Sequence, residues 1–149
     1  MPSTQLPGSP PRPRPPLTAE PNERTSAMTN AVLYIEDNPD NITLVERMLK
    51  TRPDLRFLSA ANAHDGLALA NSASPRLILR DRRLPDMSGN EVLRQLKAST
   101  PTATIPVVVL SGDSSREHTD ELTRLGATEF LAKPFDVHQL MSLVERFCT

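Results

Sequence analysis

The sequence predicts an α/β domain in which helices cover both faces of a parallel, five-stranded sheet. Three observations predict it. Short apolar runs of strand length alternate with segments whose apolar residues recur at helical spacing. Five such runs each precede one helical segment, an order typical of parallel sheets with crossover helices. The runs hold few polar residues, as expected of strands that are buried on both faces.

The first two strands are expected at 32–35 and 56–58. Asn38-Pro39 predicts the start of the first helix, because Asn is a favoured N-cap and Pro suits the first helical position. A short second helix is expected after Asn62. These signals are local, so they predict where the elements begin without any tertiary information.

The third strand is expected at 77–79 and leads to Asp81, and the fourth is expected at 106–110. Between them, Ser88 and Glu91 form a capping box, in which a hydroxyl and a carboxylate bond reciprocally to the backbone at a helix start. The third helix is therefore expected from Ser88 onward.

Ser114 and Glu117 form a second capping box, and Gly126 marks the end of the helix that it opens. The fifth strand is expected at 129–132, and Asp136 caps the last helix. Helical spacing predicts which five side chains this helix buries: Val137, Leu140, Met141, Val144 and Phe147.

Residues 1–30 are expected to form a disordered, Pro-rich tail, and residues 31–149 the folded domain. The run 10–16 favours a polyproline II conformation, and we favour a passive tail over a ligand for a Pro-binding partner. Met28 is an alternative start, in which case residues 1–27 would not belong to the mature protein.

Composition favours a protein that meets protein partners. The formal net charge is −1, which offers no field for DNA binding. No apolar run is long enough for a membrane helix or a signal peptide. The single cysteine, Cys148, suits a reducing compartment and is expected to be exposed near the terminus, so the cytoplasm is the expected location.

Five reactive side chains follow the strands: Glu36 and Asp37 after the first, Asp81 after the third, Ser111 after the fourth and Lys133 after the fifth. Because ligands of parallel sheets bind beyond the carboxyl ends of the strands, these groups are expected to share one site. Carboxylates about 4 Å apart repel by roughly 4 kcal/mol at an effective dielectric near 20, so either their pKa values rise or a cation lies among them. Oxygen ligands favour Mg²⁺.

Phosphoryl transfer is the chemistry that this set of groups fits. Lys133 supplies a positive charge and Ser111 a hydroxyl donor for phosphoryl oxygens, and positioning with charge neutralisation is most of what the reaction needs. Asp81 is the expected acceptor, because it ends a middle strand among the other groups.

Four segments, 33–38, 77–89, 107–112 and 130–135, resemble the four signatures of response-regulator receiver domains of two-component signalling. The resemblance runs from about residue 31 to residue 147. It implies a flavodoxin-like sheet of order 2-1-3-4-5. The segment 34–38 is also similar to receivers of hybrid histidine kinases, which suggests a phosphorelay role.

The resemblance implies that Asp81 is the phosphoacceptor and that Ser111 and Lys133 bind the phosphoryl group. It implies four Mg²⁺-binding positions: Glu36 through the metal's waters, Asp37, Asp81 and the backbone carbonyl of Arg83.

It further implies a switch formed by Ser111 and Phe130, and a cis peptide bond before Pro134. Arg83 and Asp113 match the positions that flank the hydrolytic water in the family. We expect them to act as a gate that slows autodephosphorylation.

The chain departs from the family pattern at Arg80 and Arg82, where receivers mostly carry apolar residues. We favour the interpretation that these arginines lie along the mouth of the site at some cost in stability. The alternative is that an arginine competes with Mg²⁺ for Asp81 or Asp37.

The sequence thus predicts a single-domain response regulator that takes a phosphoryl group from a histidine kinase or a histidine phosphotransfer protein. It would not be an enzyme acting on a separate substrate, since it would catalyse only its own phosphotransfer and slow autodephosphorylation. The alternative is a pseudo-receiver that binds a partner without phosphorylation. A haloacid-dehalogenase-type phosphatase is less consistent, because Arg83 stands where its second aspartate would be.

Overall fold

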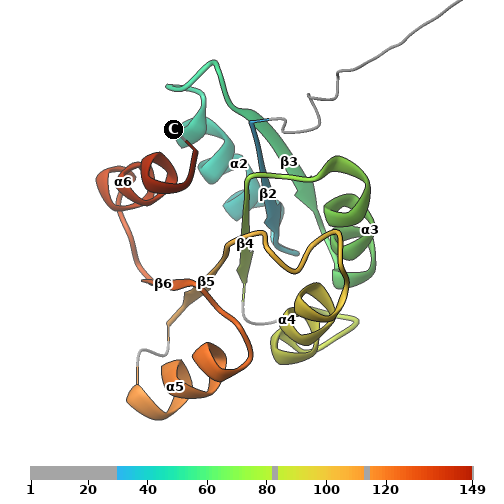
Figure 1. Ribbon diagram of the computed structural model, residues 1–149. Helices are drawn as coiled ribbons and strands as arrows, with labels where there is room; N and C mark the ends of the chain where they lie inside the picture. Colours follow the sequence, from blue (N-terminus) through green and yellow to red (C-terminus); the bar gives the residue numbers. More distant parts are fainter. Residues whose placement is uncertain (1–29, 82–83, 113–114, 149) are drawn as a thin grey trace, which may run out of the picture.

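A computed structural model describes residues 30–81, 84–112 and 115–148. The strands and helices alternate along the chain (Figure 1). The strands are β2 (Ala31–Ile35), β3 (Arg56–Ala60), β4 (Leu77–Asp81), β5 (Val107–Ser111) and β6 (Glu129–Ala132). The helices are α2 (Pro39–Leu49), α3 (Ala63–Ala73), α4 (Gly89–Ala98), α5 (Arg116–Arg124) and α6 (Val137–Cys148).

All neighbouring strands pair in parallel, and their order across the sheet is β3-β2-β4-β5-β6. This is the flavodoxin-like order 2-1-3-4-5 in chain sequence, so the predicted fold is confirmed. The central strand β4 lies between β2 and β5. The carboxyl ends of β2 and β4, which carry the acidic residues of the sequence motifs, are therefore neighbours.

Each face of the sheet carries its own apolar core. Helices α2 and α6 pack on one face, where alternate side chains of β2 and β4, such as Val32 and Leu79, are buried. Helices α3, α4 and α5 cover the other face, onto which Leu33, Ile35 and Ile78 point. This alternation follows from the two-residue period of side chains along a strand. The same period decides on which face of the sheet each polar side chain near a strand end lies.

The helix caps confirm most of the predicted starts. The side chains of Asn38, Ser88 and Asp136 accept hydrogen bonds from backbone N–H groups of α2, α4 and α6. One start is corrected: the N-cap of α5 is Ser115, whose hydroxyl accepts from the backbone N–H of His118, and not the predicted Ser114. Two adjacent serines give the same local signal, so the sequence alone could not choose between them.

Helix α6 buries a different set of side chains from the predicted one. Leu140 and Val144 are buried as expected, and Met141 and Phe147 are half-buried against the core. Val137, however, is 38% exposed, and Leu143 is buried instead. Cys148 is only 2% exposed, so the prediction of an exposed thiol is wrong. The helix stays regular to its last residue, which keeps Cys148 on the core-facing side, and burial raises the pKa of its thiol.

Some expectations fall outside the described residues. These are the Pro-rich tail with its alternative start, Arg82, and the pair Arg83 and Asp113 with the predicted metal-binding carbonyl of Arg83. Among the helices that the structure describes, none combines the length and apolar character that a membrane crossing requires.

Candidate phosphoacceptor and metal site

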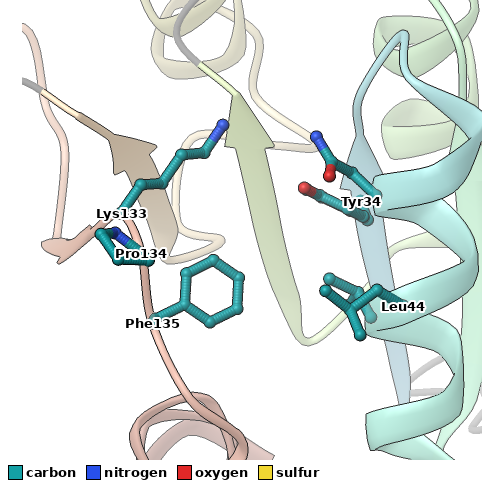
Figure 2. Close-up of a pocket in the computed structure, with 7 residues that line it drawn as sticks. Tyr34, Leu44, Lys133, Pro134 and Phe135 are labelled. Carbon is teal, nitrogen blue, oxygen red and sulfur yellow. The ribbon is translucent and has the colours of Figure 1, made fainter.

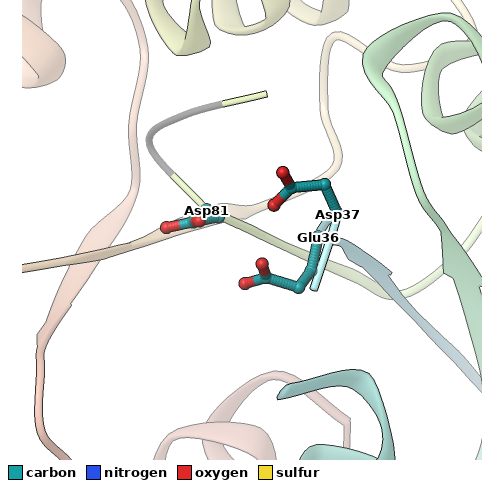
Figure 3. A group of neighbouring side chains, drawn as sticks. All are labelled: Glu36, Asp37 and Asp81. Atoms are coloured by element: carbon teal, nitrogen blue, oxygen red, sulfur yellow. The ribbon is translucent and has the colours of Figure 1, made fainter. Parts of the chain in front are cut away.

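Three carboxylates meet at the carboxyl edge of the sheet, where β2 and β4 end side by side (Figure 3). Glu36 and Asp37 follow β2 directly, and Asp81 is the last residue of β4. One carboxylate oxygen from each of the three lies within 4.8 Å of the others. The register explains this closeness, because Ile35 pairs with Arg80 and the next residue of each strand is part of the cluster.

Glu36 is the most deeply placed of the three, with 1% of its surface exposed. The Tyr34 hydroxyl donates to its Oε1 at 2.9 Å, and the backbone N–H of Asn38 donates to its Oε2 at 3.0 Å. Burial raises the pKa of Glu36, and the charge of Asp81 adds to this, while the bonds from Asn38 and Tyr34 oppose it. An additional positive charge nearby would therefore stabilise the ionised cluster.

Lys133 supplies one such charge, because its Nζ lies 2.8 Å from Oδ1 of Asp81. The loop after β6 positions this lysine. Its backbone N–H donates to the carbonyl of Ser111 at 2.9 Å, and the peptide bond to Pro134 is cis, as the sequence predicted. Lys133 thus reaches Asp81 across the end of β5.

Arg80 supplies a second positive charge from within the sheet. Its side chain is completely buried, and Nη1 donates to the backbone carbonyl of Asp81 at 2.8 Å. The prediction that this arginine lies along the mouth of the site is therefore wrong. Its strand partners Ile35 and Val109 point to the face that α3, α4 and α5 cover, so strand alternation directs Arg80 into that core.

The two predicted switch residues lie on neighbouring strands. Ser111 is buried at the end of β5, and Phe130 on β6 is half-buried against the core under α3, α4 and α5. Phe130 pairs in register with Val109, two residues before Ser111. Ser111 and Phe130 thus lie on paired strands, and their coupled movement stays a prediction.

A pocket of about 380 Å³ opens beside the acidic cluster (Figure 2). Tyr34 from β2 lines one side and Lys133 lines the other. The remaining wall is mostly apolar and consists of Asn41, Leu44, Val45, Pro134 and Phe135. Tyr34 and Lys133, which contact Glu36 and Asp81 respectively, thus line the same pocket.

The donor set fits Mg²⁺. The three grouped side chains offer only carboxylate oxygens, the ligands that this ion prefers. Asp37 is exposed and Asp81 partly exposed, so two of the three carboxylates are open to solvent while Glu36 lies behind them. Such a site can hold a hydrated ion and still admit a phosphoryl oxygen.

Comparison with known proteins identifies the class. Residues 32–145 match the family of response regulator receiver domains, so the chain belongs to this family of two-component signalling domains. It is 30% identical over 115 residues to Protein PilH of Pseudomonas aeruginosa, covering 76% of this chain and 93% of PilH. It is 30% identical over 122 residues to the DNA-binding transcriptional regulator NtrC of Proteus hauseri, covering 82% of this chain but only 25% of NtrC. It thus spans about a quarter of that relative.

Solved structures agree with this assignment. Chemotaxis response regulator CheY4 of Vibrio cholerae has a TM-score of 0.74 and 26% identity, over 80% of this chain and 99% of that one. The receiver domain of sensor histidine kinase PA1611 from Pseudomonas aeruginosa PAO1 has a TM-score of 0.72 and 27% identity, over 80% and 97% of the two chains. That receiver was crystallised with a magnesium ion coordinated in its active-site cleft.

Sequence reasoning brought Glu36, Asp37, Asp81 and Lys133 together correctly, but it missed Tyr34. This residue belongs to the apolar run of the first strand and to the segment 34–38, but neither pattern predicts a role for its hydroxyl in the site. The available signal was a phenol group two residues before Glu36, since residues i and i+2 of a strand share one face. A buried tyrosine hydroxyl normally has a hydrogen-bond partner, and that geometry leaves Glu36 as the nearest polar group.

Proposed function

We propose that this chain is a response regulator that accepts a phosphoryl group on Asp81 from a phosphohistidine of a histidine kinase or a histidine phosphotransfer protein. The observation that carries the proposal is the contact between Lys133 Nζ and Asp81 Oδ1 at the centre of a three-carboxylate cluster. An isolated structural ion pair would not need Glu36 and Asp37 beside it, because two further carboxylates only add repulsion.

In the proposed reaction, a carboxylate oxygen of Asp81 attacks phosphorus while the P–N bond to the donor imidazole breaks. Lys133 moves from Asp81 to a phosphoryl oxygen and holds its negative charge, and Ser111 donates its hydroxyl to another oxygen. Glu36, Asp37 and Asp81 would hold Mg²⁺ together with the carbonyl of Arg83. When bound, the ion supplies neutralisation of charge on the phosphoryl oxygens.

Signalling would follow from a change in population between two conformations of the surface formed by α5, β6 and α6. Ser111 and Phe130 are the proposed switch residues, and Arg83 with Asp113 the proposed gate on hydrolysis. The proposed domain comprises residues 31–149, with residues 1–30 as a tail, and the output would be a protein contact or onward phosphotransfer. We propose a cytoplasmic location, because the thiol of Cys148 suits a reducing compartment.

One observation favours a second candidate, a pseudo-receiver that binds a partner without phosphorylation. Arg80 is buried and bonded to the carbonyl of Asp81, so the acceptor already has two positive groups of the chain beside it. These two positive charges would lower the affinity of the carboxylate cluster for Mg²⁺. They would thereby also lower the reactivity that the ion confers on Asp81.

Incubation with Mg²⁺ and acetyl phosphate, followed by intact-mass measurement, separates the two candidates. The response regulator should gain one phosphoryl group, and Asp81→Asn should gain none. Asp86→Asn is the matched control, since Asp86 is a nearby carboxylate that bonds the backbone of α3 and lies outside the cluster. A folded wild-type protein that gains no mass would overturn the proposal in favour of the pseudo-receiver.

A further inference from the structure

Tyr34 carries the one phenol group of this chain, and its placement in the sheet is unusual for a polar side chain. It lies in β2 between β3 and β4, and only 1% of its surface is exposed. The apolar residues on either side of it along the strand, Leu33 and Ile35, fill their positions without needing a polar partner. The hydroxyl of Tyr34 needs one, and Glu36 Oε1 accepts its hydrogen bond at 2.9 Å.

The two hydrogen bonds to Glu36 fix its carboxylate at both ends. Oε1 accepts from Tyr34, and Oε2 accepts from the backbone N–H of Asn38 at 3.0 Å. Each carboxylate oxygen has a second lone pair, so the group remains able to accept two more bonds. The backbone bond survives any substitution at position 34, whereas the bond to Oε1 depends on the tyrosine hydroxyl.

Glu36 is also the member of the cluster with the greatest need for support. It is buried, whereas Asp37 is exposed and Asp81 is tied to Lys133. A buried carboxylate that rotates away from the cluster would present no oxygen towards Mg²⁺. Its orientation therefore decides whether it helps to bind the ion. Groups that orient metal-binding side chains in this way typically change metal affinity by about 10- to 100-fold when removed.

We infer that Tyr34 is a positioning residue of the metal site, whose hydroxyl holds the Glu36 carboxylate in the orientation that serves Mg²⁺. The inference rests on the proposed function, because it requires the acidic cluster to bind this ion. Figure 2 shows the Tyr34 hydroxyl pointing towards the side of the pocket that Lys133 lines. The two residues therefore support neighbouring carboxylates from opposite walls of one pocket.

The test compares Mg²⁺ affinity, measured by titration calorimetry with the ion alone, in wild type, Tyr34→Phe, Glu36→Gln and the double variant. Tyr34→Phe keeps the ring and removes only the hydroxyl, so we expect affinity to fall about 10-fold, the lower end of the range for such partners. In the Glu36→Gln background the same substitution should have no further effect, because Tyr34 acts through that carboxylate.

Thr102→Val is the matched control for losing a buried hydroxyl. Thr102 is completely buried, and its Oγ1 donates to the carbonyl of Leu96 at 2.5 Å, away from the acidic cluster. This variant should bind Mg²⁺ as wild type does, even if it unfolds at a lower denaturant concentration. If Thr102→Val lost as much Mg²⁺ affinity as Tyr34→Phe, the loss in Tyr34→Phe would be explained by lower stability alone. That result would overturn the inference.

The chain also has a direct spectroscopic readout, because it contains one tyrosine and no tryptophan. Its tyrosine fluorescence therefore reports on the Tyr34 hydroxyl. The emission of the wild type should change on Mg²⁺ addition with the same midpoint as the calorimetric titration, and this change should vanish in Glu36→Gln.

Besides the Thr102→Val result, three further results would count against the account, and they are distinguishable. If the wild type binds Mg²⁺ but Tyr34→Phe binds it equally well, the positioning role is wrong and the proposed function stands. The positioning role is also wrong if Tyr34→Phe loses the same factor with and without Glu36. A wild type that binds no Mg²⁺ would overturn the proposed function and this inference together.

Discussion

Glu36 and Arg80 are two buried charged side chains at the ends of the neighbouring strands β2 and β4, and the chain stabilises them in different ways. Glu36 lies on the α2 and α6 side of the sheet, where a tyrosine hydroxyl and a backbone N–H bond its two oxygens. Arg80 lies on the opposite face and donates to the backbone carbonyl of Asp81. Glu36 contributes negative charge to the carboxylate cluster, and Arg80 places a positive charge against the main-chain carbonyl of Asp81.

The difference shows how the same edge of the sheet is balanced electrostatically. In the proposed metal site the three carboxylates would attract Mg²⁺, while Lys133 and Arg80 neutralise part of their charge. The family pattern predicts Lys133 at this place, but the buried arginine is a feature of this chain. Glu36 and Arg80 should therefore act on metal affinity in opposite directions.

Among the substitutions that test this comparison, the largest effect is expected from Arg80→Met, which keeps an unbranched side chain and removes the buried charge. Mg²⁺ affinity should rise several-fold, because loss of a nearby positive charge is worth on the order of 1 kcal/mol after screening. The free energy of unfolding should fall, since the substitution removes the charged donor of a buried hydrogen bond, and such bonds contribute about 1.5–3 kcal/mol. Calorimetric Mg²⁺ titration and urea denaturation measure the two quantities.

Arg76→Met is the control for Arg80→Met. Arg76 immediately precedes β4, at the opposite end from the site, and bonds Asn30 instead of the acceptor. This variant should leave Mg²⁺ affinity unchanged. Weaker Mg²⁺ binding in Arg80→Met would mean that the arginine positions Asp81 for the ion, and it would contradict the charge argument.

The substitution Glu36→Gln tests the role of the buried Glu36 charge through the pH dependence of the free energy of unfolding. Burial and the Asp81 charge raise the pKa of Glu36 above its ordinary value of 4.5 in the folded state. The folded protein then binds more protons than the unfolded chain, so this group destabilises the fold as pH rises from 4.5 through the raised pKa. With a chelator present, the wild type should lose stability over this window and Glu36→Gln should lose less. Parallel curves of unfolding free energy against pH would contradict this.

Asp86→Asn should have a smaller effect, of the opposite sign, on the pH dependence of the free energy of unfolding. The backbone N–H groups of Ala63 and His64 lower the pKa of Asp86 in the folded state. Its contribution is thus present above the ordinary value of 3.8 and is lost as pH falls through the lowered pKa. In acid titrations followed by circular dichroism, the wild type should lose more stability than Asp86→Asn below about pH 4. Equal losses would show that these bonds contribute nothing at the α3 start.

The alternation of strands and helices and the acidic cluster were predicted well, because both follow from local patterns and from the geometry of parallel strands. The strand order was predicted from the resemblance to receiver domains. Glu36, Asp37 and Asp81 meet because they end neighbouring strands, and that neighbourhood follows from the fold. Arg80 was predicted along the mouth of the site, because an arginine must either be paired or extend its charge to solvent. Its burial depends on the pairing of Ile35, Arg80 and Val109 across three strands, which local signals do not contain.

The central claim is that Asp81 is the phosphoacceptor, and locating the phosphoryl group within the chain tests it most directly. The protein would be phosphorylated with acetyl phosphate and Mg²⁺, the acyl phosphate reduced with borohydride, and the modified peptide identified by mass spectrometry. The account predicts modification at Asp81 alone. Modification at Asp37 or at any other carboxylate, with Asp81 left intact, would contradict it.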